Sequence, residues 1–267
     1  MNKINKKTVV AIGGVDSSGG AGLFTDSLAI RSGGFHCAPV PVLNTVQSGL
    51  VFKGIIEIES AVFLEQLKLI FESQNVAAIK TGALGGSNTV NALVEFIEKL
   101  LIKIPVIADP VLGSSTGGEL ANENAVASIK NRLFPLCEVV TPNISEASVL
   151  CGFDVFDLKT MEFAGRRILA MGAKNVLVKG GHLNIGARQR DIFDVLVTES
   201  GDSHILKGRV VDISEIRGTG CALASLIAAN RALGFTVLKS VEMAREKLAD
   251  AMENSYSAGD GPGILGF

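Results

Sequence analysis

The chain of 267 residues is 47% hydrophobic and 19% charged, with a formal net charge of −2 at pH 7. This composition supports a large buried core, and the absence of a long basic run argues against a nucleic-acid partner. The four scattered cysteines form neither a C-x-x-C pair nor a zinc-type spacing with histidine, which favours free thiols in the cytoplasm. No apolar stretch is long enough to span a bilayer, and the first apolar run is too short for a signal peptide, so we expect no membrane partner.

Short apolar segments alternate with amphipathic ones along the chain. Strands are predicted over 8–13, 36–43, 76–79, 104–108, 137–140 and 175–178, with an antiparallel pair over 191–198 and 204–211. Helices are predicted up to about Ser32, and over 60–73, 88–102, 121–133, 145–151, 160–171, from 219 onward and over 237–253. Pro39 and Pro41 indicate an edge strand, 44–49 a polar loop and 255–267 a surface tail. The alternation predicts one doubly wound α/β domain over 1–267, with a mostly parallel sheet covered on both faces.

The segment Arg217-Gly218-Thr219-Gly220-Cys221 is predicted to be a tight glycine turn that opens a helix. Glycine can adopt positive φ, and the N-terminus of a helix offers unpaired N–H groups and a positive dipole end to an anion. The same position should lower the pKa of the Cys221 thiol. A purely structural turn followed by a buried cysteine fits these residues equally well.

A second glycine-rich loop, 13–22, follows the first predicted strand and matches neither a Walker A loop nor a clean G-x-G-x-x-G pattern. In doubly wound sheets ligands bind beyond the carboxyl ends of the strands. Polar residues gather at those ends: Asp16, Gln47, Lys80, Asp109, Asn143, Glu146 and Lys179. Each alone is more readily explained as a cap or turn residue. Together, carboxylates and backbone anion sites suit Mg²⁺ and phosphate chemistry.

These segments together resemble the hydroxymethylpyrimidine/phosphomethylpyrimidine kinases, the thiamin-pathway members of the ribokinase-like superfamily. The matching segments, in family order, are Gly14-Val15-Asp16-Ser17-Ser18-Gly19-Gly20-Ala21-Gly22, Asp26, Gln47, Lys80-Thr81-Gly82, Asp109-Pro110-Val111, Thr141-Pro142-Asn143-Ile144-Ser145-Glu146-Ala147, Lys179-Gly180-Gly181-His182 and Gly218-Thr219-Gly220-Cys221. The resemblance runs from residue 8 to about 253. It implies a three-layer α/β/α sandwich, a homodimer, ATP as co-substrate, and Mg²⁺. The implied reaction is phosphorylation of 4-amino-5-hydroxymethyl-2-methylpyrimidine, and then of its monophosphate.

The resemblance also implies a role for individual residues. The transferred phosphoryl group would be held by Gly218, Thr219 and Gly220, and Cys221 would accept the proton of the substrate hydroxymethyl group. The pyrimidine pocket would contain Gly14, Ala21, Asp26, Gln47 and Val111. The nucleotide side would contain Lys179, Asn143 and Arg217. Mg²⁺ would lie near Asp109 and Glu146, the latter in an N-x-x-E motif with Asn143.

Several positions depart from the family pattern. Ile216-Arg217 replaces the usual Thr-His, so Arg217 either adds charge near the phosphates or points to solvent. Ala83 replaces a common Met, the expected lid 112–118 has no Lys, and the C-terminal Gly-Pro-Val-x-His becomes Gly261-Pro262-Gly263-Ile264-Leu265. The second phosphorylation is therefore less strongly implied than the first. Two alternatives stay open, a pyridoxal kinase of the same fold and a non-catalytic sensor of pyrimidines or nucleotides.

Overall fold

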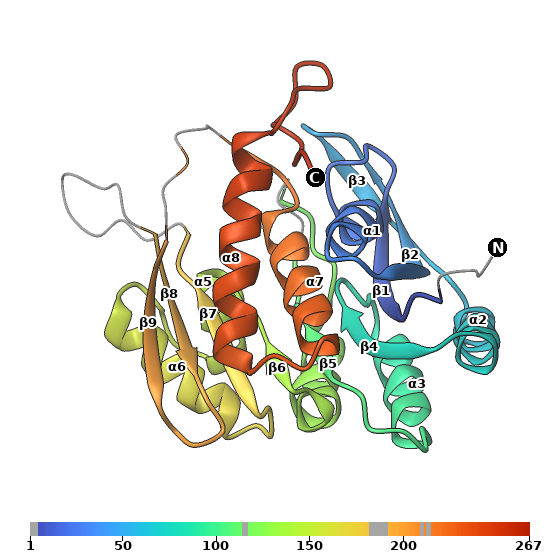
Figure 1. Ribbon diagram of the computed structural model, residues 1–267, viewed down its shortest axis with the longest axis horizontal. Helices are drawn as coiled ribbons and strands as arrows, with labels where there is room; N and C mark the ends of the chain where they lie inside the picture. The colour runs from blue at the N-terminus through green and yellow to red at the C-terminus, as the bar shows by residue number, and fades with distance from the viewer. Residues whose placement is uncertain (1–4, 114–116, 182–191, 209–210, 212–214) are drawn as a thin grey trace.

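The computed structural model describes residues 5–113, 117–181, 192–208, 211 and 215–267 (Figure 1). Within these residues nine strands form one sheet: β1 (Thr8–Asp16), β2 (His36–Gln47), β3 (Phe52–Glu57), β4 (Val76–Thr81), β5 (Val106–Ala108), β6 (Val139–Val140), β7 (Asn175–Lys179), β8 (Ile192–Val197) and β9 (Ser203–Gly208). The α-helices are α1 (Gly22–Ser32), α2 (Ser60–Ser73), α3 (Ser87–Glu98), α4 (Glu123–Ser128), α5 (Ile144–Cys151), α6 (Leu158–Leu169), α7 (Thr219–Ala232) and α8 (Val237–Glu253). None of the described helices is long and apolar enough to cross a membrane.

The strand order is β3-β2-β1-β4-β5-β6-β7-β8-β9. Strands β2, β1, β4, β5, β6 and β7 pair in parallel, whereas β3, β8 and β9 are antiparallel to their neighbours. The predicted parallel sheet is therefore confirmed, with antiparallel strands at both edges. Because the parallel strands all end on the same side, the polar residues that follow them are brought to one edge of the sheet.

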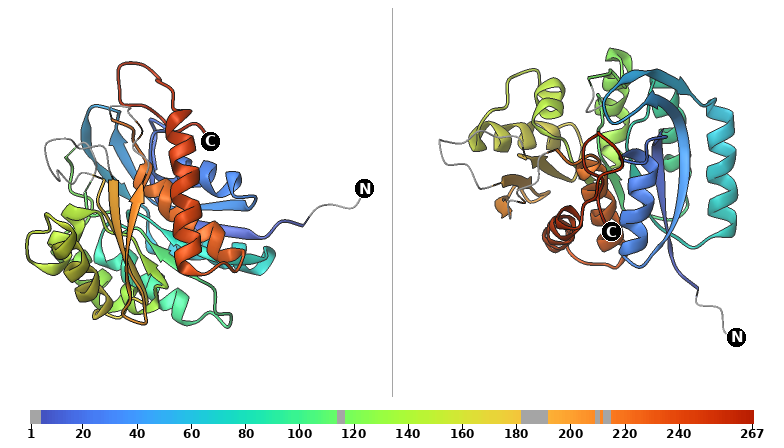
Figure 2. Two further views of the ribbon diagram at one scale, coloured as in Figure 1. Left: turned by 60° about the vertical axis from the view of Figure 1, so that its left-hand side comes forward. Right: turned by 90° about the horizontal axis from the view of Figure 1, so that it is seen from above.

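Alternating side chains of the strands supply two separate cores. In β1, Val10 and Ile12 belong to the core under α2 to α6, while Val9 and Ala11 belong to the core under α1, α7 and α8. Successive residues of a strand face opposite sides of the sheet, so an apolar strand supplies both cores at once. Figure 2 shows the resulting three layers, with α1, α7 and α8 on one side of the sheet. This is the predicted α/β/α sandwich.

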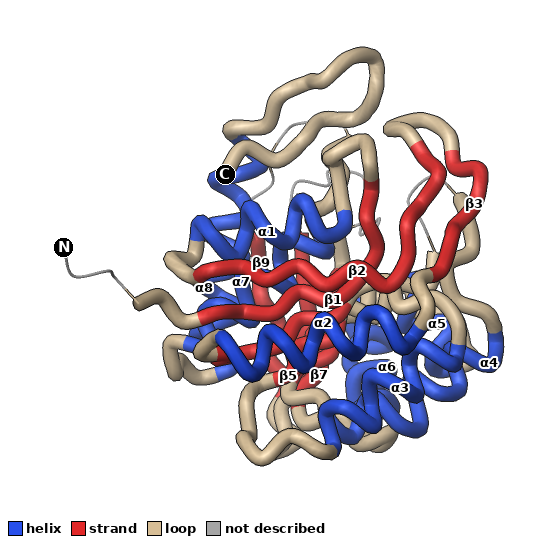
Figure 3. The backbone as a smooth tube through the Cα atoms, turned by 90° about the vertical axis from the view of Figure 1, so that its right-hand side faces the viewer, coloured by secondary structure: helices blue, strands red, loops and turns tan. Residues whose placement is uncertain are grey.

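The predicted edge position of the strand containing Pro39 and Pro41 is wrong for the strand as a whole. Strand β2 lies between β1 and β3 (Figure 3). However, β3 pairs only with Leu43–Gln47 of β2, so the two prolines lie in the part of β2 that β3 does not reach. A proline lacks the N–H that a second neighbour would need. The expected polar loop 44–49 is also wrong, because β2 continues to Gln47 and turns directly into β3.

The helix predicted over 121–133 is shorter than expected. It is α-helical only over Glu123–Ser128, and continues as a π-helical turn over Ile129–Leu133 and a 3₁₀ turn over Phe134–Leu136. The tail after α8 is only partly on the surface. Tyr256 pairs with Ile264, Gly263 pairs with Ile216, and Leu265 is buried against the core under α7 and α8. The C-terminus is thereby held beside the start of α7.

Candidate active site

The glycine turn at the start of α7 is confirmed, with Gly218 as the residue that precedes the helix. Gly218 has φ of 77°, and a Cβ there would lie 2.6 Å from the carbonyl oxygen of Gly20. A Cβ on Gly220 would lie 3.0 Å from Lys179 Nζ and 3.7 Å from Asp109 Oδ2. The turn thus packs between the glycine loop 13–22 and an ion pair. Any side chain at Gly218 would push the turn away from the glycine loop. The free N–H groups of the helix start remain available for an anion.

The glycine loop 13–22 folds back on itself beside this turn. Gly22, the first residue of α1, has φ of 60°, and a Cβ on it would lie 2.3 Å from the carbonyl oxygen of Gly14. A Cβ on Gly14 would in turn lie 2.7 Å from Leu43 Cδ1 of β2 and 3.8 Å from the Ala83 side chain. Gly14 of β1 therefore packs closely against Leu43 of β2. It lies toward the end of the sheet at which β2 ends with Gln47. Ala21 immediately precedes α1 in the same loop.

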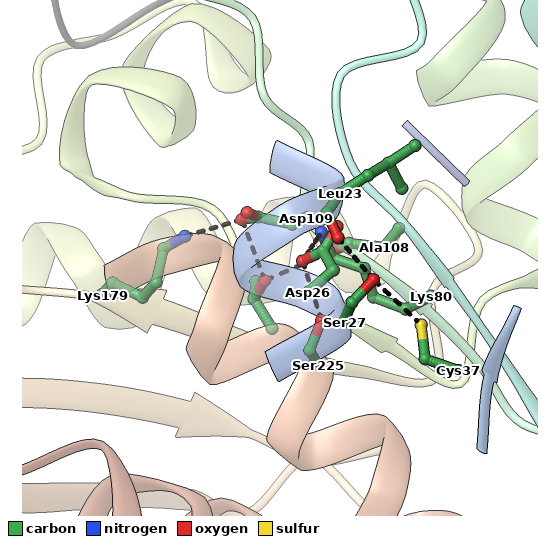
Figure 4. Close-up of polar contacts among 10 residues, drawn as sticks. Leu23, Asp26, Ser27, Cys37, Lys80, Ala108, Asp109, Lys179 and Ser225 are labelled. Carbon is green, nitrogen blue, oxygen red and sulfur yellow. Dashed lines mark hydrogen bonds and ion pairs between the residues drawn. The ribbon is translucent and has the colours of Figure 1, made fainter. Parts of the chain in front are cut away.

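An ion pair between Lys179 and Asp109 borders the other side of the glycine turn (Figure 4). Lys179 Nζ lies 2.7 Å from Asp109 Oδ1, and the Thr141 hydroxyl donates a hydrogen bond of 3.2 Å to the same oxygen. Burial lowers the pKa of Lys179, but the Asp109 and Glu146 carboxylates outweigh it and the net pKa is raised. The lysine stays charged and faces the helix start.

Asn143 and Glu146 form a reciprocal capping box at the start of α5. The Glu146 backbone N–H donates to Asn143 Oδ1 at 2.9 Å, and the Asn143 backbone N–H donates to Glu146 Oε2 at 2.7 Å. The capping interpretation is therefore confirmed, and it holds the Glu146 carboxylate close to Lys179 and Asp109. Burial and the Asp109 charge raise the pKa of Glu146 to about 7, against the opposing effect of Lys179.

A second acid–lysine pair joins α1 to β4 beside α7 (Figure 4). Lys80 Nζ lies 2.7 Å from Asp26 Oδ1, both side chains are at most 1% exposed, and the Ser225 hydroxyl donates to the same oxygen at 2.8 Å. The other carboxylate oxygen of Asp26, Oδ2, is buried and has no hydrogen-bond partner among the described residues. Burial raises the pKa of Asp26, and Lys80 opposes that rise. The sequence places Lys80 among the polar residues at the strand ends, but a lysine at the end of an apolar strand does not reveal its partner.

The expected low pKa of Cys221 is wrong. Burial raises the pKa of its thiol to about 11, and the nearby Asp26 and Asp109 carboxylates raise it further. Lys80 and the backbone N–H of Gly22 act in the opposite direction without overcoming burial. A helix start lowers a thiol pKa only where no larger effect opposes it. Cys221 does lie in the field of Lys80, Asp26 and Asp109, so it belongs to the site.

The remaining predicted pocket residues lie at the same sheet edge. Gln47 Oε1 is a buried acceptor without a hydrogen-bond partner in the described structure, as is Asp26 Oδ2. Val111 is half-buried, and its backbone N–H donates to the carbonyl oxygen of Asp109 at 2.8 Å. His182 and residues 114–116 of the expected lid lie outside the described residues. Buried acceptors without partners at a sheet edge indicate positions where a ligand donates hydrogen bonds.

The Arg217 side chain is not directed to solvent. Only 6% of its surface is exposed, and its guanidinium ion-pairs with Asp16 Oδ2 at 3.3 Å. It also donates to the Ser18 hydroxyl at 3.3 Å and to the Ser48 carbonyl oxygen at 3.0 Å. These contacts place the Arg217 side chain against the glycine loop and the turn that follows β2, while its role on the nucleotide side stays a prediction.

No group of three or more metal-binding side chains is found in the part of the chain that the structure describes. Asp109 and Glu146 nevertheless lie close enough for one charge to affect the other. One or two carboxylates together with substrate phosphates are the usual ligands of Mg²⁺. A cavity of about 530 Å³ between the β2–β3 turn and the C-terminal tail contains none of the predicted site residues. The two acid–lysine pairs and the glycine turn lie instead around the start of α7.

Comparison with known proteins gives consistent matches. The family model for phosphomethylpyrimidine kinase matches residues 16–266. The hydroxymethylpyrimidine/phosphomethylpyrimidine kinase of Synechococcus elongatus is 35% identical over 96% of this chain and 95% of its own length. A thiamine biosynthesis bifunctional protein of Geobacter sulfurreducens is 33% identical over 96% of this chain and 51% of its own length. Among solved structures, an ADP complex of Bacillus subtilis pyridoxal kinase matches with a TM-score of 0.87 at 25% identity, over 98% of this chain and 97% of that one.

Proposed function

This chain belongs to the phosphomethylpyrimidine kinase family, and from that premise we propose that it phosphorylates 4-amino-5-hydroxymethyl-2-methylpyrimidine and its monophosphate in thiamin biosynthesis. It is a kinase with a ribokinase-like fold, and ATP is its co-substrate. The observation that carries the assignment of residues is the position of Cys221. It lies at the start of α7, close enough to both acid–lysine pairs for their charges and its own to act on one another.

In the proposed reaction the chain's own groups mainly position reactants and stabilise charge. The backbone N–H groups of Gly218, Thr219 and Gly220 hold the transferred phosphoryl group, with Lys179 beside it. The hydroxymethyl oxygen of the substrate attacks the γ-phosphorus, the bond from that phosphorus to the oxygen shared with the β-phosphate breaks, and ADP leaves. Cys221 Sγ accepts the hydroxyl proton. At neutral pH only a small fraction of free enzyme holds the thiolate, because its pKa is raised to about 11.

The pyrimidine is proposed to bind where buried acceptors lack partners. Asp26 Oδ2 and Gln47 Oε1 are buried without hydrogen-bond partners among the described residues. An aminopyrimidine carries an exocyclic NH₂ with two donors, which suits two acceptors that would otherwise be unsatisfied. Gly14, Ala21 and Val111 would form the wall of the pocket. Their small size leaves room for a planar ring.

Mg²⁺ is proposed to be held by Asp109 and, through water, by Glu146. When bound, the ion would neutralise negative charge on the nucleotide phosphates. Lys179 forms an ion pair with Asp109 at 2.7 Å, and the capping box with Asn143 fixes the direction of the Glu146 side chain. Asn143 itself pairs with Lys179 through the backbone, so both residues stay on the nucleotide side.

We further propose that the whole chain is one kinase domain, that it works in the cytoplasm and that it forms a homodimer. The continuous sheet supports the first statement, and the free described cysteines support the second. Exposed apolar side chains on α1 and on the β2–β3 hairpin support the third: Phe24, Leu28, Val46 and Ile56. Light scattering coupled to size-exclusion chromatography tests the homodimer.

Pyridoxal kinase activity is a second candidate, because the matching Bacillus subtilis structure carries that name. Hydroxymethylpyrimidine and pyridoxal compete for the same pocket, so one assay with both substrates and mass measurement of the products ranks them. A higher kcat/KM for pyridoxal would replace the proposed substrate. Tight pyrimidine binding by calorimetry without any ATP-dependent product would instead indicate a sensor.

The residue assignment is tested by Cys221→Ala. Removal of the proposed base should abolish most turnover, while the fold and ATP binding survive, because alanine fits the helix start. Circular dichroism and ATP titration serve as the controls. Turnover close to that of the unaltered enzyme would exclude Cys221 from the mechanism.

A further inference from the structure

We propose that Arg217 is a positioning residue for the pyrimidine pocket, one that holds the β2–β3 turn, and with it Gln47, against the glycine loop. The inference rests on the proposed function, because it concerns how that pocket recognises its pyrimidine. It gives a buried arginine, which the reaction itself does not use, a specific part in substrate binding.

The side chain of Arg217 joins two segments that are distant in the sequence. It contacts Asp16 and Ser18 of the glycine loop, and it donates to the carbonyl oxygen of Ser48 at 3.0 Å. Ser48 directly follows Gln47, the proposed pyrimidine ligand. The Ser48 backbone N–H donates to the Val51 carbonyl oxygen, which closes the turn between β2 and β3. The guanidinium therefore fixes the peptide next to Gln47 from one side of this turn.

The C-terminal tail supports the same turn from another direction. The Arg217 backbone N–H donates to the Gly263 carbonyl oxygen at 3.0 Å, and Gly263 N–H donates to Glu215 at 2.9 Å. A Cβ on Gly49 would lie 3.3 Å from both Gly261 Cα and Pro262 Cδ. Arg217 and the tail segment 261–263, which we call the latch, thus hold residues 48 and 49 together. Both parts of the latch are places where the chain departs from the family pattern.

Arg217 is suited to this task by geometry as well as charge. Its planar fork can contact a carboxylate, a hydroxyl and a carbonyl oxygen at once, whereas a lysine supplies one compact ammonium group. Without it, the buried Asp16 carboxylate loses its charged partner and the Ser48 carbonyl loses its donor. The turn then samples more conformations, and each substrate molecule has to order Gln47 on binding. The cost should appear in pyrimidine affinity.

The test compares Arg217→Met with the unaltered full-length enzyme in steady-state kinetics with hydroxymethylpyrimidine and ATP. We expect the KM for the pyrimidine to rise by at least about tenfold, while kcat and the KM for ATP change by less than about threefold. Arg217→Lys keeps the charge for Asp16 and should restore part of the loss. An unchanged pyrimidine KM, or an equal fall in kcat, overturns the proposal.

A matched control is Arg231→Met, which removes a partly buried arginine of α7 from its ion pair with Glu138, away from the pocket. This variant should leave the pyrimidine KM unchanged. Hydrogen exchange of the substrate-free proteins adds a second readout. Arg217→Met should accelerate exchange at residues 44–51 and leave exchange at 223–229 as it is in the unaltered protein. If the substitution changed the exchange of both segments by the same factor, the proposal would be overturned.

Failure of the proposed function is recognised separately. If the unaltered enzyme forms no phosphorylated pyrimidine, the substrate assignment is wrong. The exchange measurement uses no substrate, so it still shows whether Arg217 holds the turn beside Gln47. Unaltered exchange in Arg217→Met would then overturn the latch as well.

Discussion

The two acid–lysine pairs beside α7 have the same length but different surroundings. Asp26–Lys80 and Asp109–Lys179 both have N–O distances of 2.7 Å. The two carboxylates are almost equally buried, with Asp26 1% and Asp109 2% exposed, whereas the lysines differ, with Lys80 0% and Lys179 13% exposed. Asp26–Lys80 is sealed between α1, β4 and α7, while Asp109–Lys179 opens onto the glycine turn where an anion can bind.

This difference separates a pair that maintains charge from a pair that meets the nucleotide. A fully buried lysine can remain charged only beside its carboxylate, and Lys80 does so with the net pKa raised by Asp26. The Lys80 charge then opposes, without overcoming, the rise that burial causes in the pKa of Cys221. Lys179 has a similar partner but also a free approach to the helix start. We therefore expect loss of Lys80 to affect folding first, and loss of Lys179 to affect catalysis first.

The largest expected effect is on stability, in Lys80→Met. Methionine keeps most of the volume but leaves the Asp26 carboxylate buried without a counter-charge, which should cost about 3–5 kcal/mol of the free energy of unfolding. Urea denaturation followed by circular dichroism measures it. The double variant Lys80→Met with Asp26→Leu should recover much of this loss, because it removes the stranded charge. A single variant as stable as the unaltered protein would contradict the distinction between the pairs.

Lys179→Met should instead leave the protein folded and reduce kcat by about 10²–10³-fold. A charged group that faces a transferring phosphoryl group typically contributes this much. The stranded Asp109 carboxylate is buried as well, but it keeps a hydrogen bond from Thr141 and the 13% exposed position of Lys179 admits water, so the loss of unfolding free energy should be smaller than in Lys80→Met. Initial rates and a urea melt of the same preparation make the comparison. If Lys179→Met lost stability rather than rate, the two pairs would have to exchange roles.

The sequence predicted the arrangement of the site well and its electrostatics poorly. Strand ends and glycine loops follow from local patterns, so the glycine turn of α7 and the capping box at Asn143 were predicted in place. Lys80 pairs with Asp26, which is 54 residues away in the sequence, so this pair depends on which strand lies beside which helix. The prediction of a low pKa for Cys221 was wrong for the same reason, because the burial that raises this pKa arises from packing of distant segments. The sequence also could not decide whether Arg217 points to solvent, because its contacts with Asp16 and Ser48 are set by tertiary structure.

The raised pKa of Cys221 predicts a rate that increases with pH. At pH values below the pKa of about 11, the fraction of Cys221 that is thiolate grows as the pH rises. The kcat should therefore rise between about pH 7 and pH 9, by up to about tenfold per pH unit. Cys221→Asp supplies a carboxylate that is already ionised over this range, and its profile should be flat. Rates measured at saturating ATP test this. A flat profile in the unaltered enzyme would mean that the thiol donates a hydrogen bond rather than accepting the proton.

The smallest effect concerns Glu146. Its pKa is raised to about 7 by burial and by Asp109, so the carboxyl group is mostly protonated below that pH and ionised above it. Since a metal ligand must be deprotonated, the Mg²⁺ concentration for half-maximal rate should fall several-fold between about pH 6 and pH 8. Folding stability follows the opposite sign: the contribution of Glu146 is fully present below about pH 4.5 and is lost as pH rises through about 7.

Glu146→Gln separates these two effects. The amide oxygen can still accept the hydrogen bond from the Asn143 backbone, so the capping box and α5 should persist. The variant should need more Mg²⁺ at pH 8, show little change in that requirement with pH, and lose the pH-dependent part of its stability between about pH 4.5 and pH 7. Because ATP also titrates near this range, the unaltered enzyme and the variant are measured with the same nucleotide solutions. If both showed the same Mg²⁺ dependence at every pH, Glu146 would serve α5 alone, and Asp109, the ion-pair partner of Lys179, would be the metal-facing carboxylate.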